Sequence, residues 1–179
     1  MIITKDNLTI RSAEQKDAII LTMWWNDGNV MEHAGFPLGI NQSIPTTIKQ
    51  INRNKDIHSQ LCIIEVDNKR IGEINYKIEG KVAEIGIKIC DFNYHNQGIG
   101  TKALKLLIKY LFENFNIDKI VLDTNLKNKR AQHVYEKIGF VKVRVREHSW
   151  KNQLGEVQSS VDYELTRNKY LRGLENNEY

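Results

Sequence analysis

The chain has 179 residues, which is enough for one domain with a sizeable hydrophobic core and too few for two ordinary domains. Its 41% hydrophobic and 27% charged residues are typical of a folded globular protein, and its net charge of +4 is spread along the chain. No apolar run approaches the roughly 20 residues of a membrane span, and the N-terminus lacks the long apolar core of a signal peptide. We expect a cytoplasmic protein of one domain, residues 1–179, with no membrane partner.

The cysteines and histidines give no sign of a disulfide or a metal site. Cys62 and Cys90 each lie inside an apolar run typical of a buried strand, so we expect two free thiols. The five histidines are scattered without the spacing of metal ligands. Basic residues become more frequent at 102–105 and 127–130, but no recognised nucleic-acid motif or stacked aromatic pattern accompanies them. We expect no metal and no nucleic acid, and these basic residues suit a small polyanion.

Apolar periodicity and turn residues predict the secondary structure in chain order. The predicted elements are a strand over 8–11, helices over 13–25 and 45–54, strands over 60–66, 70–78 and 82–90, a helix over 98–114, a strand over 119–123, a helix over 128–138, and strands over 140–148 and 156–166. The short turns at 67–69 and 79–81 join the middle strands into antiparallel hairpins. This order predicts an α/β (α+β) fold, with a mixed sheet and helices on its faces.

Local signals refine these elements. Ser12 followed by Gln15 has the pattern of a capping box, which would begin the first long helix. Residues 26–43 form a loop that is long for a compact domain, and such loops often carry function. Gly139 is placed to end the helix before it as a left-handed cap. The polar residues 168–179 are expected to fray.

The most informative stretch is a pair of glycines, Gly98 and Gly100, at the start of an amphipathic helix. Unpaired N–H groups and the helix dipole favour a phosphate at such a point, and glycine lets the backbone approach a ligand. Alone, the pair fits a plain turn, a pyrophosphate loop, or the dinucleotide fingerprint G-x-G-x-x-A, with Asp123 at the end of the next strand. The fingerprint is disfavoured because residues 91–97 separate the glycines from the preceding strand, and repeated parallel units are lacking.

Two segments carry a family resemblance. His95 to Thr101 resembles the (Arg/Gln)-x-x-Gly-x-(Gly/Ala) signature of the GNAT superfamily of acetyl-CoA-dependent N-acetyltransferases. Asn128 to Phe140 resembles its second signature, Asn-x-Arg-Ala-x-x-x-Tyr-Glu-Lys-x-Gly-Phe. The element order over the expected core, 8–166, is similar to that fold, which has a mostly antiparallel central sheet with helices on both faces and two splayed parallel strands. His95 stands where the family usually has Arg or Gln, so altered charge pairing is expected there.

The resemblance implies that acetyl-CoA is the co-substrate. It implies that the pyrophosphate binds to the backbone amides of the glycine loop. It also implies that Asn128 hydrogen-bonds to the pantetheine arm. It also implies that a backbone N–H near Ile89–Cys90 polarises the thioester carbonyl. The residues implied for acetyl-CoA are Ile89, Cys90, Gln97, Gly98, Ile99, Gly100, Thr101 and Asn128.

The resemblance also implies direct attack of an amine on the thioester. Tyr135 matches the family's general acid, which would protonate the departing thiolate. Asp123 resembles an active-site aspartate of the aminoglycoside 6′-N-acetyltransferases and is one candidate for the base. Glu84 and Glu73 are rival bases on central strands, although a solvated or salt-bridged carboxylate has the same appearance in the sequence.

The sequence leaves the acceptor amine open. Trp24, Trp25, His33 and Phe36 lie in or beside the loop at 26–43, which commonly helps to form the acceptor site in this family. Adjacent helical residues do not share a face, so at least one tryptophan is expected in the core. The acceptor is a protein N-terminus or a small amine, with an aminoglycoside-type antibiotic as one alternative and a non-catalytic coenzyme A-binding module as another. The protein is expected to be a monomer or a homodimer.

Overall fold

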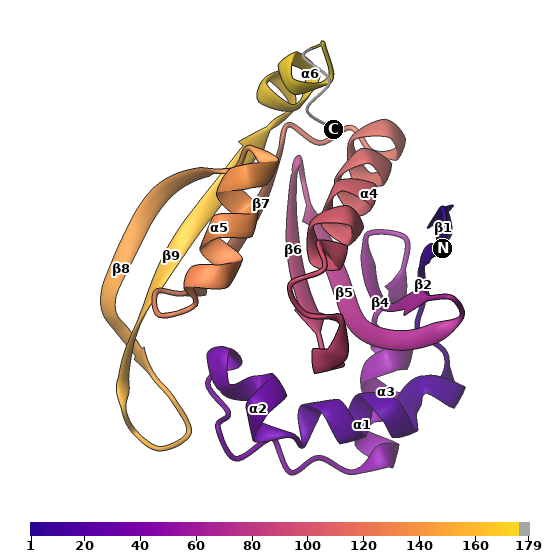
Figure 1. Ribbon diagram of the computed structural model, residues 1–179, viewed down its shortest axis with the longest axis vertical. Coiled ribbons are helices and arrows are strands. Elements are labelled where there is room, and N and C mark those ends of the chain that lie inside the picture. Colours follow the sequence, from indigo (N-terminus) through magenta and orange to yellow (C-terminus); the bar gives the residue numbers. More distant parts are fainter. Residues whose placement is uncertain (176–179) are drawn as a thin grey trace.

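A computed structural model describes residues 1–175 of the chain (Figure 1). Within them, the strands form one sheet in the order β1-β2-β4-β5-β6-β7-β9-β8, and β3 pairs with β4 outside this path. The strands are β1 (Ile2–Lys5), β2 (Leu8–Ser12), β3 (Lys55–Asp56), β4 (Ser59–Val66), β5 (Lys69–Glu79), β6 (Val82–Ile89), β7 (Lys119–Asn125), β8 (Val141–Lys151) and β9 (Val157–Thr166). The helices are α1 (Ala18–Trp25), α2 (Gly28–Met31), α3 (Ile44–Arg53), α4 (Ile99–Asn114), α5 (Lys129–Ile138) and α6 (Arg167–Glu175), with 3-10 turns η1 (Gln15–Asp17), η2 (Glu32–Ala34) and η3 (Phe92–Tyr94).

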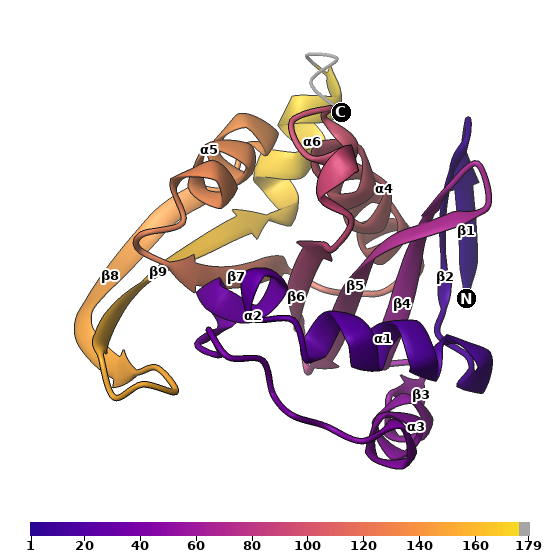
Figure 2. The ribbon, with the colours of Figure 1, turned by 60° about the horizontal axis from the view of Figure 1, so that its bottom comes forward.

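The sheet carries helices on both faces, as predicted (Figure 2). Successive side chains of a strand point to opposite faces, and β4 shows this directly. Leu61 and Ile63 belong to a core with α1 and α3, whereas Cys62 and Ile64 belong to the larger core beneath α4 and α5. All strand pairs of the sheet path except β6 with β7 are antiparallel. The expected mixed, mostly antiparallel fold is therefore confirmed.

Helix α4 is anchored by the face that its sequence predicts. Leu104, Leu107, Ile108 and Leu111 recur at helical spacing and are at most 1% exposed. Burial of such side chains stabilises the fold by about 1.5–3 kcal/mol each. The helix is therefore a rigid support for the glycine loop that precedes it.

Strands β6 and β7 separate soon after they pair. Their parallel register covers only three residue pairs, from Val82 with Lys119 to Glu84 with Val121. Beyond this point each strand continues without a partner on the shared side, β6 as far as Ile89. The expected splay of two parallel strands is thus present, and it opens the sheet toward the glycine loop.

Three local predictions need correction. The N-terminal capping box is formed by Glu14 and Asp17, because the Ser12 hydroxyl is the last side chain of β2 and donates to Gln60 Oε1 at 2.7 Å. Strand β1 was not predicted, although it pairs along its whole length with β2. Residues 167–175 form a helix rather than a frayed tail, since Tyr170 stacks on Phe112 with 4.7 Å between ring centroids. The last part of that predicted tail, 176–179, lies outside the described residues.

The predictions for Gly139 and for the two cysteines are confirmed. Gly139 ends α5 with φ of 106°, and both cysteines are free thiols buried in the core. Burial raises the pKa of Cys62 to about 12, so it remains an inert thiol. Among residues 1–175 there is no helix with both the length and the apolar content of a membrane span. The same residues contain no group of three His, Cys, Asp or Glu side chains arranged to hold a metal ion.

Candidate active site

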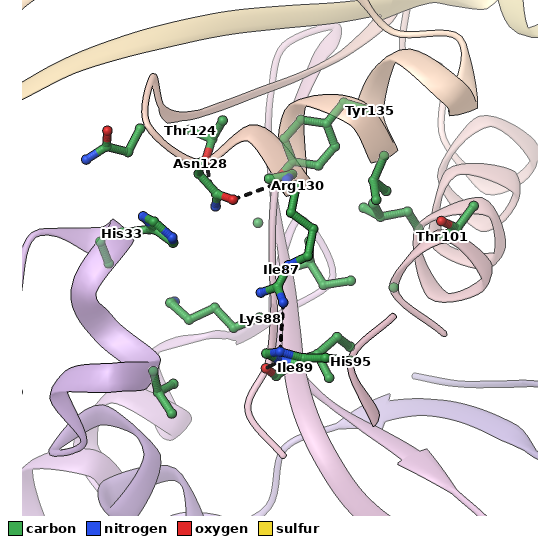
Figure 3. A pocket seen from close by; sticks show the side chains of 18 of the residues that line it. His33, Ile87, Lys88, Ile89, His95, Thr101, Thr124, Asn128, Arg130 and Tyr135 are labelled. Atoms are coloured by element: carbon green, nitrogen blue, oxygen red, sulfur yellow. Dashed lines mark hydrogen bonds between the residues drawn. The ribbon is translucent and has the colours of Figure 1, made fainter. Parts of the chain in front are cut away.

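A cleft of about 650 Å³ lies where β6 and β7 separate (Figure 3). One wall is the glycine loop and the start of α4, and another is α5 with the end of β7. The α2–η2 segment, β6, η3, β8 and β9 also contribute to the lining. The sequence motifs at 95–101 and 128–140 therefore meet in one cavity, although more than half of its lining residues lie outside both motifs.

The glycine loop presents an uncapped helix N-terminus to the cleft. Gly98 is the N-cap of α4 with φ of 73°, and no side chain caps the helix. The backbone ladder begins only with Lys102 N–H to Gly98 O at 3.0 Å, so the N–H groups of Ile99, Gly100 and Thr101 have no partner within residues 1–175. Such a helix end attracts an anion through its N–H groups and its dipole.

Gly100 is not required by the packing of the described chain. A Cβ built there would meet only Ile89 Cγ1, at an ordinary 3.7 Å. The position lines the cleft, so the space that glycine leaves is available to a ligand. Gly98 is different, because its positive φ alone favours glycine.

His95 ties the loop to the two other walls. Its Nε2 lies 2.8 Å from the Ile89 carbonyl oxygen, and its Nδ1 lies 2.7 Å from Arg130 Nη1 (Figure 3). A guanidinium can only donate, so Nδ1 accepts and Nε2 carries the ring hydrogen. The departure from the family pattern is thereby explained: in place of a charged side chain at 95, a neutral ring holds the Arg130 cation beside the cleft.

The open edge of β6 supplies further donors. The Cys90 N–H donates to the carbonyl oxygen of Ile71, near the start of β5, at 2.8 Å. It therefore faces β5 and is not free for a ligand. Since hydrogen bonds of an antiparallel strand alternate in direction, the amides of Ile87 and Ile89 point to the opposite edge, toward the splay. Both residues line the cleft. The Ile89 N–H therefore stays a candidate for the ligand contact that was expected near Ile89 and Cys90. The expectation for Cys90 is wrong, because its N–H is bonded within the sheet.

Tyr135 lies in the wall formed by α5. Its side chain is buried, with 6% exposed, and its ring contacts Tyr163 with 5.6 Å between centroids. Burial, with the charge of Asp123 adding to it, raises the pKa of Tyr135 to about 12. The hydroxyl has no hydrogen-bond partner within residues 1–175. It is therefore protonated at neutral pH and available to a ligand.

Asp123 lines the cleft but is already paired. Its carboxylate lies 3.0 Å from Arg146 Nη2, and the same guanidinium lies 2.8 Å from Asp162. The hydrogen bond and charge of Asp162, together with Asp123, raise the pKa of Arg146. Arg146 was not predicted, because it reaches the cleft only through the pairing of β8 with β9 and of β9 with β7. The ion pair fixes the Asp123 carboxylate at the cleft wall.

The rival carboxylates lie elsewhere. Glu73 is 2% exposed and binds Trp25 Nε1 at 2.9 Å and Lys88 Nζ at 2.8 Å. Glu84 is exposed, and both glutamates line a second cavity rather than the cleft. Along β6, Glu84 is five residues from Ile89, or roughly 16 Å at the usual rise of a strand.

The remaining predicted contacts are placed as follows. Gln97 is exposed, hydrogen-bonds to Asn93 O and lies outside the cleft lining. Asn128 lines the cleft and caps α5 through Ala131 N–H at 3.1 Å, while its Nδ2 donates to Thr124 at 3.3 Å. One hydrogen of that amide group remains available to a ligand.

The predicted acceptor loop does border the cleft. It contributes Asn29, Val30, His33 and Ala34, whereas Trp24 and Trp25 are both core residues. The turn between β8 and β9 fastens this loop. Gln153 makes three hydrogen bonds to it, with Gly35 O at 2.8 Å, Leu38 N–H at 3.0 Å and Gly39 O at 2.9 Å.

A model of the acetyltransferase (GNAT) domain matches residues 7–141 of the chain. The chain belongs to this family. The dinucleotide fingerprint at the glycines is accordingly wrong, and the antiparallel sheet agrees, since a doubly wound domain requires parallel strands.

Individual relatives are more distant. Spermidine N(1)-acetyltransferase of Escherichia coli (strain K12) is 34% identical over 95 residues, which are 49% of this chain and 50% of that protein. An N-alpha-acetyltransferase of Sulfurisphaera tokodaii is 28% identical over 109 residues, 52% of this chain and 64% of that protein. The chain thus spans about half the length of the first of these relatives and 64% of the second.

Solved structures match nearly the whole chain. The ribosomal alpha-N-protein acetyltransferase RimL in complex with coenzyme A has a TM-score of 0.82 at 19% identity, over 93% of this chain and 98% of that chain. Spermidine N-acetyltransferase from Vibrio cholerae in complex with coenzyme A and spermine also has a TM-score of 0.82, at 22% identity, over 93% and 99%. At such identities the likeness shows the fold, which the family assignment already requires.

Proposed function

We propose that this protein is an N-acetyltransferase that transfers the acetyl group of acetyl-CoA to an amine. The observation that carries the proposal is the meeting, in one cleft, of an uncapped helix N-terminus, an open strand edge and a free tyrosine hydroxyl. The family assignment supports the reaction. Acetyl-CoA as the co-substrate is supported by the similar structures that were solved in complex with coenzyme A.

The residues of the cleft fit the groups of acetyl-CoA. The amides of Ile99, Gly100 and Thr101 would bind the pyrophosphate, with Arg130 supplying a cation beside it. The free hydrogen of Asn128 would reach the pantetheine amides. The Ile89 N–H at the open edge of β6 would polarise the thioester carbonyl, which is an oxyanion-hole role.

The chemistry is direct transfer. The amine nitrogen forms a bond to the acetyl carbon, the carbon–sulfur bond breaks, and the nitrogen loses a proton. Tyr135 would donate a hydrogen bond to the departing thiolate, because its raised pKa keeps the hydroxyl protonated. An amine must be neutral to attack, so a base must take a proton from its ammonium form.

Asp123 is the base that we propose, acting directly or through water. It is the only one of the three candidate carboxylates that lines the cleft within the described residues. Its ion pair with Arg146 would hold it in position. We assign no catalytic role to Glu84 or Glu73, which lie at the second cavity.

Both acceptor classes, a protein N-terminus and a small amine, have support from relatives. Two matching proteins are named spermidine N(1)-acetyltransferase and N-alpha-acetyltransferase, and a similar structure is that of an alpha-N-protein acetyltransferase. The cleft contains one carboxylate among its described lining residues, and that carboxylate is already ion-paired. The charges of a bound polycation would therefore have almost no negative partners there. This favours the protein N-terminus over an aminoglycoside.

The test is a binding and turnover experiment with the purified chain. Calorimetry with acetyl-CoA should show one site per chain, and release of free thiol should follow the addition of an acceptor amine. Absence of acetyl-CoA binding would overturn the proposal. Binding without turnover on any amine of a broad panel would instead favour a non-catalytic coenzyme A-binding module.

A further inference from the structure

A second cavity, of about 470 Å³, lies on the face of the sheet that α1 and α3 cover. Strands β4, β5 and β6 form its floor. Its lining includes five uncharged polar residues: Gln50, Asn54, Ser59, Gln60 and Asn75. Trp25, Tyr76 and Leu61 provide apolar walls. Neither sequence motif contains any of these residues.

The second cavity adjoins the cleft at β6. Lys88 lines both cavities, and Gly86 lines the cleft while its cross-strand partner Asn75 lines the second cavity. Gly86 has no left-handed backbone conformation that would require glycine. A Cβ at that position would come within 3.1 Å of Asn75 Nδ2. The missing side chain therefore leaves a shallow notch, against which the Asn75 carboxamide packs. The two cavities share the neighbouring residue Lys88.

The charges around this cavity are largely matched. Lys88 binds Glu73 at 2.8 Å, and although burial acts to lower the pKa of Lys88, the charge and hydrogen bond of Glu73 raise it above the ordinary value. Lys77 pairs with Glu79 and lies directly across the strands from Glu84. A polycation would therefore meet no excess of free carboxylates.

The hydrogen-bonding groups, by contrast, are partly free. The Asn75 carboxamide, next to the notch, has no hydrogen-bond partner within residues 1–175. Gln50 accepts from Gln42 through Oε1, which leaves its own NH₂ group available. A carboxamide that can both donate and accept suits a peptide group.

We propose that the second cavity binds the part of the acceptor that follows its amino group, and that this part is an uncharged peptide chain. The acceptor is then a protein N-terminus whose first residue enters the cleft and whose next residues cross Gly86 to reach Asn75. From Lys88 to Glu84 the strand spans about 13 Å, which matches roughly four residues of extended peptide. This inference rests on the proposed acetyltransferase activity.

The test compares two acceptors with the same first residue, seryl amide and an uncharged tetrapeptide amide that begins with serine. The variants are Asn75→Ala, which removes the free carboxamide, and Gly86→Ala, which crowds the notch. The control is Asn52→Ala on the exposed surface of α3, which lines neither cavity. Thermal unfolding of each variant reports whether the fold is kept.

The wild-type chain should have a KM for the tetrapeptide at least about tenfold below its KM for seryl amide, as two or more added hydrogen bonds allow. Asn75→Ala and Gly86→Ala should each raise the tetrapeptide KM by about three- to tenfold, the loss of one such bond. Asn75→Ala should leave the KM values for seryl amide and acetyl-CoA unchanged, and Asn52→Ala should change none of the three KM values.

Equal KM values for the two acceptors, or variants that raise the KM of seryl amide as much as that of the tetrapeptide, would overturn the inference while the acetyltransferase activity stands. A preference for spermidine over the tetrapeptide would overturn it in the same way. Failure to bind acetyl-CoA would overturn the proposed function, and this inference with it.

Discussion

Replacement of Tyr135 by phenylalanine removes one hydroxyl from the wall of the cleft. The pKa of Tyr135 is raised to about 12 by burial. A thiol such as that of coenzyme A has a pKa near 8.5, so complete proton transfer from Tyr135 to the thiolate is uphill by about 3.5 units, or about 5 kcal/mol. Tyr135 should therefore act by hydrogen-bonding the developing thiolate rather than by surrendering its proton fully.

A hydrogen bond to a charged group contributes about 1.5–3 kcal/mol. Tyr135→Phe should accordingly lower kcat by about 10- to 150-fold, which is less than the upper range of general acid catalysis. Protein stability should change little, because the hydroxyl has no partner within residues 1–175 to lose. The KM for acetyl-CoA should change less than kcat, since the bond strengthens only as charge develops on sulfur.

The assay is steady-state release of free thiol with a saturating amine, together with urea unfolding of both proteins. Tyr163→Phe is the matched control, because it removes a neighbouring phenol whose hydroxyl donates to Glu136 rather than facing the cleft. The wild-type rate should show no loss attributable to Tyr135 below about pH 11, since the acid form persists below its pKa. An unchanged kcat in Tyr135→Phe would refute the assigned role, and a loss above about 10⁴-fold would refute the hydrogen-bond account.

Three further substitutions test other parts of the structure. Gly100→Val should raise the Kd of acetyl-CoA by at least about tenfold in calorimetry, because it fills ligand space beside Ile89 at the loop; an unchanged Kd would remove this turn from the binding site. Leu107→Ala, at a fully buried position, should lower the free energy of unfolding by about 2–5 kcal/mol in urea titration, and a loss below about 1 kcal/mol would contradict the packing described for α4. Gln153→Ala should raise the KM of the acceptor by about tenfold, because it removes the two side-chain hydrogen bonds to Leu38 and Gly39 of the loop at 26–43, and a parallel rise in the KM of acetyl-CoA would show that the turn acts on the whole cleft instead.

Most of the element order could be predicted because its signals are local. The apolar face of α4, the hairpins of β4 to β6 and the glycine cap at Gly139 each depend on residues close in sequence. The start of α1 could not be predicted in this way, since the Ser12 hydroxyl hydrogen-bonds to Gln60 of the distant strand β4 instead of capping the helix. Helix α6 was missed for a similar reason: its polar sequence is held by one buried ring, Tyr170, against Phe112.

The candidate site divides along the same line. The residues of the two motifs were predicted because each motif is one continuous segment around a helix N-terminus. Arg146 and Trp150 were missed because β8 reaches the cleft only through its pairing with β9. Glu84 was named because it lies on a central strand, but strand membership does not say at which end of the strand a side chain lies. Cys90 was named beside Ile89, and the alternation of hydrogen bonds separates the two.

The short pairing of β6 with β7 has a consequence for solubility. An unpaired strand edge is ordinarily a hazard, because strands of other molecules can add to it and begin aggregation. Here the unpaired stretch belongs to β6, which lies between β5 and β7 in the sheet rather than at an outer edge (Figure 1). The fold thereby keeps free backbone donors for a small ligand without placing them at an outer edge of the sheet.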